Sequence, residues 1–210
     1  MLLMVSGTTL NTLMGKTIKA FLLFNCGNIG TILFKVKKEG WKRMSIESVR
    51  EHFKQWDKDQ DIMEFDTSSA TVELAAAAIG VAPARIAKTL SFRGEGEDAI
   101  LVVAAGDAKI DNKKFRHTFG MKARMLTPDE VLDQTGHAIG GVCPFGLKNK
   151  LEVYLDVSMN RFETLFPACG STNSAIELTC EEIAIYSFAK DWVDVCKGWE
   201  EEDELREHAG

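Results

Sequence analysis

The sequence predicts a mixed α/β domain with an antiparallel or mixed sheet. Segments with helical spacing alternate with short apolar runs, and Gly94-Glu95-Gly96 separates two such runs as a hairpin turn would. The 210 residues are 45% hydrophobic and 27% charged, which is typical of a globular protein that folds around its own core. Five cysteines form no C-x-x-C pair, and their odd number favours reduced thiols in a cytosolic protein.

Two helices are expected near the start of this domain. Apolar residues recur at helical spacing behind Ser45, whose side chain is expected to accept the first free amides of the helix. A second helix is expected from Ser68 through an alanine run to Ile79, where Gly80 provides a left-handed cap. A short turn is expected over 83–87.

Capping boxes mark two later helices. Thr127 is followed three residues later by Glu130, and Thr179 by Glu182, so each pair can satisfy the amides at a helix start. A left-handed glycine, Gly136, is expected to end the first of these helices. The later helical segments are predicted over 106–119, 127–136 and 179–189.

The predicted strands are short runs of apolar and β-branched residues between turn signals. One of them, 99–105, is apolar throughout and is therefore expected to be buried on both faces. A glycine-rich loop is expected over 139–146. The predicted strands are 88–92, 99–105, 121–126, 151–157, 163–166, 175–178 and 192–195.

Both ends of the chain differ from the rest. Residues 1–43 hold seven basic residues and one acid, and 1–34 lack clear periodicity, so we expect 1–43 to lie outside the fold, with translation starting at Met44. The alternative is a membrane or export segment in 1–34, but its uncharged stretch over 20–34 is shorter than the roughly 20 residues of a membrane span. The domain is expected over 44–199, followed by an acidic, solvated tail over 200–210.

Charge and motif content exclude several functions. Residues 44–199 carry a net charge of −7, so the domain is not expected to bind DNA or other long nucleic acid non-specifically, and any nucleic-acid role requires a small local site. The four histidines are scattered, without metal-ligand spacing, and no G-x-S-x-G motif is present. Leu147 stands where a phosphate-binding loop needs lysine. No metal and no cofactor is expected.

Some residues could carry chemistry, and each has a plain structural alternative. Lys88, between an apolar segment and a strand, either extends to solvent or projects its ammonium into a cleft to hold a carboxyl, phosphate or ester oxygen. The loop over 140–144 is either a tight turn or a cradle whose amides face a developing oxyanion. Cys143, near His137, is either a nucleophile or a buried thiol. The same ambiguity, between a site residue and a cap or turn residue, applies to Asp107, Asp156 and Ser171.

In combination, these segments resemble a known family. The YbaK-type family of prolyl-tRNA-synthetase-associated aminoacyl-tRNA editing domains is similar over nearly all of 46–190, with its motifs in the same order and spacing. The motifs that carry the resemblance are Ala87-Lys88-Thr89-Leu90, Val102–Asp107, Gly140–Gly146, Ala168-Cys169-Gly170-Ser171 and Ile176-Glu177-Leu178.

The resemblance implies a single domain with a mixed, partly barrel-like sheet flanked by helices, which hydrolyses the ester between a wrong amino acid and the 3′ end of tRNA. It implies that Lys88 is the essential lysine that holds the terminal phosphate or the substrate, and that Gly140 and Gly141 border the aminoacyl pocket and supply backbone contacts. Cys143 stands where relatives usually have serine or threonine. The substrate-binding residues implied by the resemblance are Thr89, Val142, Cys143, Pro144, Gly170 and Ser171.

The expected function is therefore that of a cytoplasmic, trans-acting deacylase of misacylated tRNA, with tRNA(Pro) carrying a small wrong amino acid as the expected substrate. Such hydrolysis needs only water or a neighbouring group of the substrate, together with electrostatic stabilisation of the oxyanion. The expected partners are the 3′ end of the misacylated tRNA and prolyl-tRNA synthetase, without a membrane. The alternative is a non-catalytic module that binds aminoacyl-tRNA or a synthetase.

Overall fold

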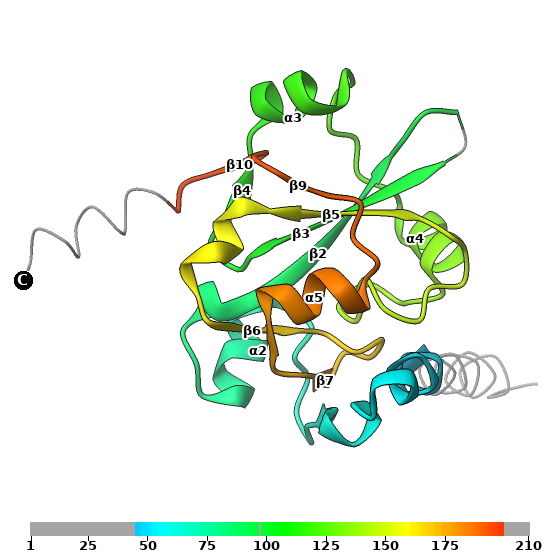
Figure 1. Ribbon diagram of the computed structural model, residues 1–210, viewed down its shortest axis with the longest axis vertical. Coiled ribbons are helices and arrows are strands. Elements are labelled where there is room, and N and C mark those ends of the chain that lie inside the picture. Colours follow the sequence, from blue (N-terminus) through cyan, green and yellow to red (C-terminus); the bar gives the residue numbers. More distant parts are fainter. Residues whose placement is uncertain (1–44, 97, 200–210) are drawn as a thin grey trace, which may run out of the picture. The chain divides into compact units, whose positions relative to one another are not determined.

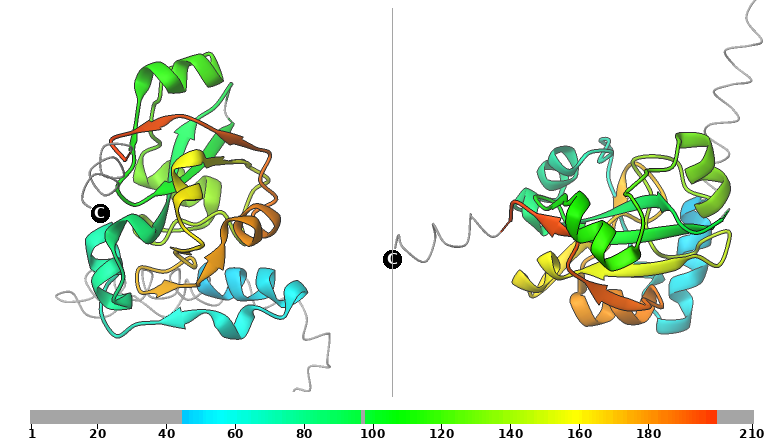
Figure 2. Two further views of the ribbon diagram at one scale, coloured as in Figure 1. Left: turned by 60° about the vertical axis from the view of Figure 1, so that its left-hand side comes forward. Right: turned by 90° about the horizontal axis from the view of Figure 1, so that it is seen from above.

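A computed structural model describes residues 45–96 and 98–199 and confirms a mixed α/β domain (Figure 1). A curled sheet lies in the middle, with α5 on one face and α2 and α4 on the other (Figure 2). The expectations for the extension 1–43, for a start at Met44 and for the acidic tail 200–210 concern residues outside those described. No helix among the described residues is long and apolar enough to span a membrane.

The main sheet has six strands in the order β8-β6-β2-β3-β5-β9. The hairpin of β2 and β3 is antiparallel, whereas β6 pairs parallel to β2 and β5 parallel to β3, so the sheet is mixed as predicted. Parallel β9 and antiparallel β8 complete the two edges. The strands are β2 (Ile86–Arg93), β3 (Ala99–Ala105), β5 (Glu152–Asp156), β6 (Thr164–Pro167), β8 (Leu178–Thr179) and β9 (Asp191–Val193).

Two small antiparallel pairs lie beside this sheet: β1 (Met63–Glu64) with β7 (Ser174–Ala175), and β4 (Lys109–Ile110) with β10 (Cys196–Lys197). The single strand predicted over 175–178 is wrong. The segment is divided between β7, which pairs with β1, and β8, which pairs with β6. The continuous helix predicted over 106–119 is also wrong, since a turn and β4 precede α3. The edge strand predicted over 192–195 is β9, which starts one residue earlier and ends two residues earlier.

Local sequence signals set the ends of most helices. Both predicted capping boxes are present, and left-handed glycines end two helices as predicted, Gly80 at φ +82° and Gly136 at φ +79°. A helix also spans 45–53. The labelled helices are α2 (Val72–Ile79), α3 (Asn112–Phe119), α4 (Pro128–Thr135) and α5 (Cys180–Tyr186), and the 3-10 turns are η2 (Lys54–Trp56), η3 (Asp59–Asp61), η4 (Pro83–Arg85) and η5 (Val157–Arg161).

Three expectations about element boundaries are wrong because tertiary contacts compete with local signals. The hydroxyl of Ser45 donates to the carbonyl of Gly170 instead of capping its own helix. The second helix begins after Thr71, whose side chain accepts from Leu74 N, since Ser69 is tied by its amide to the 172 carbonyl. The run 121–126 makes a single bridge, from Met125 to Phe92, instead of a strand.

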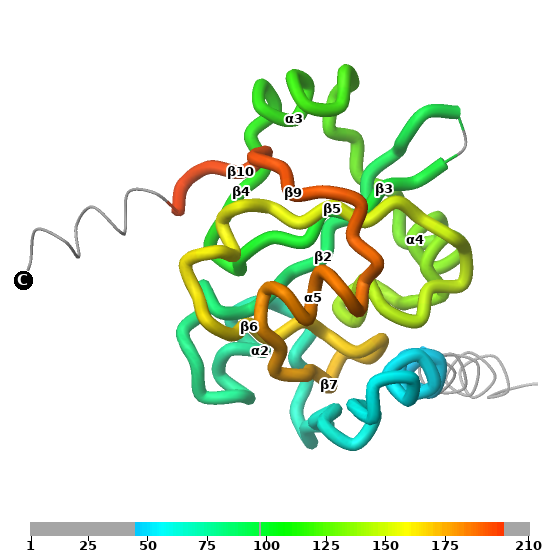
Figure 3. Tube along the Cα trace, viewed as in Figure 1, coloured from blue at the N-terminus to red at the C-terminus, as the bar shows by residue number. Residues whose placement is uncertain are grey.

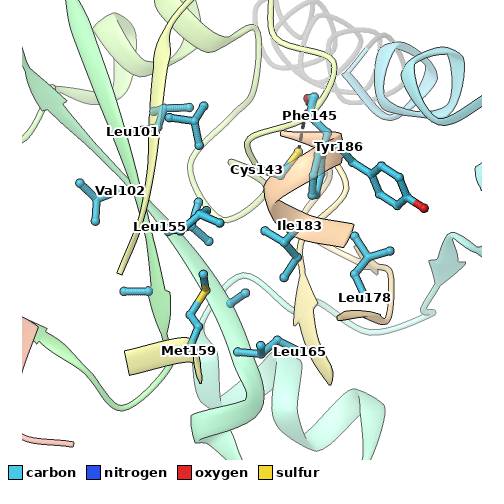
Figure 4. Packing of buried hydrophobic residues seen from close by; sticks show 14 of the residues in the cluster. Leu101, Val102, Cys143, Phe145, Leu155, Met159, Leu165, Leu178, Ile183 and Tyr186 are labelled. Atoms are coloured by element: carbon cyan, nitrogen blue, oxygen red, sulfur yellow. Dashed lines mark hydrogen bonds between the residues drawn. The ribbon is translucent and has the colours of Figure 1, made fainter. Parts of the chain in front are cut away.

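The core lies between the sheet and α5. All of β3 is buried, as predicted for 99–105. Leu101 of β3, Leu155 of β5 and Leu165 of β6 are fully buried with Ile183 of α5 in one continuous hydrophobic cluster (Figure 4). Removal of this apolar surface from water is the main source of stability, because each fully buried aliphatic side chain contributes about 1.5–3 kcal/mol. Strand β2, an inner strand of this sheet, positions the candidate site.

Candidate active site

The middle of β2 lacks a neighbouring strand on one side. Its pairing with β6 ends at Ala87, and on the same side the chain resumes pairing only where Leu126 N donates to Ser91 O at 3.0 Å. Between these points, residues 88–90 border a cleft of about 200 Å³. The cleft therefore occupies a gap in the sheet, bounded by strand pairing at both ends.

Thr89 presents unpaired polar groups at this gap. In an antiparallel ladder, alternate residues direct their N–H and C=O groups to the same side, so Thr89 directs its groups as Ser91 does, away from β3 and toward the cleft. The hydroxyl oxygen of Thr89 is also buried without a hydrogen-bond partner among the described residues. A buried polar atom without a partner is uncommon in folded proteins, which singles out the hydroxyl of Thr89, a residue that lines the cleft.

Apolar side chains from both sides of the gap form most of the cleft wall. Val72 and Ala75 come from α2, and Val131 comes from α4. Met125 and Ile139, 59% and 55% exposed, stand at its border. The remaining lining residues, none of which was predicted as a site residue, are Ser69, Ala70, Thr71, Ile86, Ala87, Leu90, Ser91, Leu126, Phe166, Ala168, Ser174 and Ala175.

Lys88 lines the cleft with a half-buried side chain, and its ammonium is hydrogen-bonded to two backbone carbonyls. Its Nζ donates to the carbonyl of Gly106 at 2.9 Å and to the carbonyl of Ala108. Burial lowers the pKa of Lys88, because desolvation disfavours the charged form. An ammonium has three donors, so the two carbonyls leave one N–H for a ligand.

The turn that holds Lys88 is itself fixed by close packing. A Cβ at Gly106 would lie 2.0 Å from the carbonyl oxygen of Pro83, so only glycine fits there. The next residue, Asp107, forms a 2.6 Å ion pair with Arg161, and both side chains are at least 85% buried. Asp107 therefore belongs to the support of the turn and not to the cleft lining.

Gly140 and Gly141 lie on different sides of the loop. Gly140 adopts φ +88° and lines the cleft, where a Cβ would lie 2.8 Å from the Cβ of Ala70. A Cβ on Gly141 would lie 2.7 Å from the backbone of Ser171, and its amide donates to Ala138 O at 2.9 Å. Gly141 thus joins two loops behind the cleft, and its amide is occupied by the turn.

The structure brings together four of the nine predicted site residues. Lys88, Thr89, Gly140 and Val142 line one cleft, which places the lysine and the glycine-rich loop side by side although they lie about fifty residues apart. The geometry does not test the chemical roles predicted for them. The predicted residues that do not line the cleft are Gly141, Cys143, Pro144, Gly170 and Ser171.

Cys143 lies in the core, where it packs beside Phe145 near Ile183 (Figure 4). Its Sγ lies 3.6 Å from Phe145 O and 3.7 Å from His137 Nδ1. Burial raises the pKa of the thiol to about 12 and lowers the pKa of His137 to about 4, so this pair stays neutral. The interpretation of Cys143 as a nucleophile is therefore wrong, because its thiolate is disfavoured.

The other ambiguous residues have structural partners. Ser171 Oγ donates to Ser174 Oγ at 2.7 Å, and Ser174 lines the cleft. Buried Asp156 accepts from the amides of Ser158 and Val195. Among residues 45–96 and 98–199, no three His, Cys, Asp or Glu side chains are grouped as metal ligands would be.

Comparisons with a family model and with known proteins all point to aminoacyl-tRNA editing domains. The family model described as aminoacyl-tRNA editing domain matches residues 66–185. The Bacillus subtilis protein YwhH, whose function is uncharacterized, is 69% identical over 157 residues, which are 75% of this chain and 100% of that protein. EbsC of Enterococcus faecalis, named as a Cys-tRNA(Pro)/Cys-tRNA(Cys) deacylase, is 28% identical over 70% of this chain and 89% of its own.

A solved structure shows the same architecture. It is described as a trans-editing enzyme for prolyl-tRNA synthetase, and it matches with a TM-score of 0.67 and 30% identity over 73% of this chain and 98% of that one. The family model covers more than half of the chain, including β2 and the glycine-rich loop, which together border the cleft. The chain belongs to the aminoacyl-tRNA editing domain family.

Proposed function

We propose that this protein is a trans-acting deacylase that hydrolyses the ester of misacylated tRNA, with tRNA(Pro) carrying a small wrong amino acid as its substrate. The observation that carries the proposal is the cleft at the β2 gap, which Lys88, Thr89 and Gly140 line together. The names of EbsC and of the trans-editing enzyme support the same reaction class.

The cleft suits a small acyl group. Its volume of about 200 Å³ is below the roughly 300–1,000 Å³ of pockets that take drug-sized ligands. Val72 and Ala75 present an apolar surface to the amino-acid side chain, while Thr89 offers polar groups to the ester and the α-amino group. An aminoacyl ester combines these two kinds of surface.

The chemistry follows from these placements. Water attacks the ester carbonyl, the bond to the ribose oxygen breaks, and the products are a free amino acid and a tRNA with a free 3′ hydroxyl. The amides of Gly140 and Val142, which make no hydrogen bond within the described residues, are available to the developing oxyanion. The third N–H of Lys88 holds a phosphate or ester oxygen of the substrate.

The reaction requires no protein nucleophile. A neighbouring hydroxyl of the substrate can position the water, which accounts for a site in which the buried Cys143 thiol takes no part. We place this activity in the cytoplasm, where tRNA is charged, with prolyl-tRNA synthetase as the partner that releases the misacylated tRNA.

The test is deacylation of Cys-, Ala- and Ser-tRNA(Pro) by the full 210-residue chain, against the rate of spontaneous hydrolysis. Two variants on one helix provide a matched comparison: Ala75→Leu fills the cleft, whereas Ala77→Leu adds the same atoms on the exposed side of α2. We expect the first to lose at least tenfold in rate and the second to keep the wild-type rate, with both folded by circular dichroism. Tight binding of these tRNAs without turnover would replace the deacylase with a binding module.

A further inference from the structure

The most positively charged surface of the domain lies next to the cleft. Between 109 and 124 the chain has six lysines and arginines and one acid, whereas the rest of 44–199 carries a net charge of −12. The segment comprises β4, α3 and the stretch that descends from α3 to α4 (Figure 3). We define the basic surface as Lys109, Lys113, Arg116, Lys122 and Arg124.

These five side chains are free to bind a partner. All five residues are exposed, and none forms an ion pair with any residue between 45 and 199 whose position is described. The acids near them are already engaged, since Asp194 pairs with Lys114 at 2.8 Å and Asp111 with Lys197 at 3.0 Å. The surface therefore retains its positive charge.

The fold gathers these charges instead of dispersing them. Lys113 and Arg116 are three residues apart on α3, opposite the buried Phe115, so they share one helix face. Lys109 lies directly opposite Lys197 in the β4–β10 pair. Because Lys197 is paired with Asp111, the charge of Lys109 is the one left for an anionic partner.

The basic surface meets the cleft at two points. Lys109 follows Ala108, whose carbonyl accepts a hydrogen bond from Lys88. Arg124 precedes Met125, which lines the cleft, and Arg124 O accepts from the amide of Arg93 in β2. Lys109 is therefore one position along the chain from a residue that contacts Lys88, and Arg124 is one position from a residue that lines the cleft.

From this geometry we infer that the basic surface binds the phosphate backbone of an RNA helix whose 3′ end enters the cleft. The inference rests on the proposed function, because an ester at the end of an RNA requires the rest of that strand to leave the cleft beside one of its borders. Lysine and arginine rows bind phosphates through charge, without reading base sequence. The acidic remainder of the domain then orients the RNA by repelling it from other faces.

The experiment compares two triple variants of the full chain. Lys113→Gln/Arg116→Gln/Lys122→Gln removes three charges from the basic surface, and Lys54→Gln/Lys148→Gln/Lys150→Gln removes three from exposed positions elsewhere. Binding of an RNA hairpin that carries no amino acid on its single-stranded 3′ end is measured by fluorescence anisotropy at several salt concentrations. We expect the first variant to bind roughly tenfold more weakly at low salt, with a shallower salt dependence, and the second to bind as wild type does.

Deacylation separates this inference from the proposed function. For aminoacyl-tRNA the basic-surface variant is expected to raise KM with little change in kcat, while hydrolysis of an aminoacyl-adenosine ester stays unchanged. Equal hairpin binding by wild type and the basic-surface variant would overturn the inference and favour an acidic protein as the partner. A third outcome is that wild type binds the hairpin without hydrolysing aminoacyl-tRNA, while the basic-surface variant fails to bind it. That result would overturn the proposed deacylase activity and support the RNA-binding surface.

Discussion

The ammonium nitrogen of Lys88 lies 2.9 Å from the carbonyl oxygen of Gly106, at the opposite end of the β2–β3 hairpin in sequence. The hairpin brings them together because Lys88 pairs with Ala104, only two residues before Gly106. The lysine thus lines the cleft and also stabilises the turn that follows β3 by hydrogen bonds to its carbonyls.

This double role predicts a combined loss in Lys88→Met. Two carbonyls lose their donor, so the free energy of unfolding is expected to fall by about 1–3 kcal/mol. Deacylation is expected to fall roughly 100-fold or more, as when a donor to a developing charge is removed. Urea unfolding and single-turnover deacylation measure the two effects, and Lys148→Met, an exposed lysine paired with Asp133, is the control. A folded Lys88→Met with full activity would contradict the site.

Gly140→Ala and Gly80→Ala separate backbone strain from blockage of the cleft. Both glycines have positive φ, at +88° and +82°, so alanine costs each about 1–2 kcal/mol. Nothing lies within 4 Å of a Cβ at Gly80, whereas at Gly140 it would meet Ala70 at 2.8 Å. We expect activity to be retained in Gly80→Ala and to fall at least tenfold in Gly140→Ala. Similar activity in both variants would remove Gly140 from the site.

Cys143→Ala is expected to lower stability without removing activity. The thiol is fully buried in the core, so its loss leaves a small cavity and costs about 1–2 kcal/mol. Deacylation is expected to stay within about twofold of wild type. In the native protein, alkylation followed by peptide mass spectrometry is expected to modify half-buried Cys180 before Cys143. Loss of activity in step with the modification of Cys143 would show that the reaction depends on this thiol.

The stability of the fold is expected to depend on pH through His137. Burial lowers its pKa from 6.5 to about 4, so between these values the unfolded chain binds the proton that the folded chain excludes. Stability is therefore complete above pH 6.5 and is lost as the pH falls toward 4, by roughly 3 kcal/mol from this residue.

Thermal unfolding of wild type and His137→Gln at pH 7 and pH 5 measures that dependence. The variant is expected to be less stable at pH 7 but to lose less on acidification. His52, whose pKa burial also lowers, acts in the same direction in both proteins and cancels in the comparison. Equal losses in the two proteins would assign the pH effect to other groups.

Local signals predicted the elements whose partners are close in sequence. The capping box of Thr127 and Glu130, the left-handed Gly80 and the fully buried run 99–105 were each predicted, because their hydrogen bonds or burial depend on a few neighbouring residues. The resemblance predicted the family and the fold, which the comparisons confirm.

Contacts between distant segments could not be predicted in this way. The gap in β2 depends on where β6 stops pairing and where Leu126 resumes it, and both depend on which distant segments pack beside β2. The contribution of α2 to the cleft could not be predicted either, because its alanine run indicates a helix but not what the helix packs against. Within one loop, Val142 faces the cleft and Cys143 the core, an assignment that requires the backbone path.

The pairing of β4 with β10 has a consequence for biosynthesis. Asp111 N donates to Val195 O, and Cys196 and Lys197 pair with the strand that follows the turn beneath Lys88. During vectorial synthesis, β2 and its turn therefore leave the ribosome long before the segment that anchors them. A nascent chain stalled before residue 195 would carry every residue that lines the cleft and still lack the strand that pairs with β4.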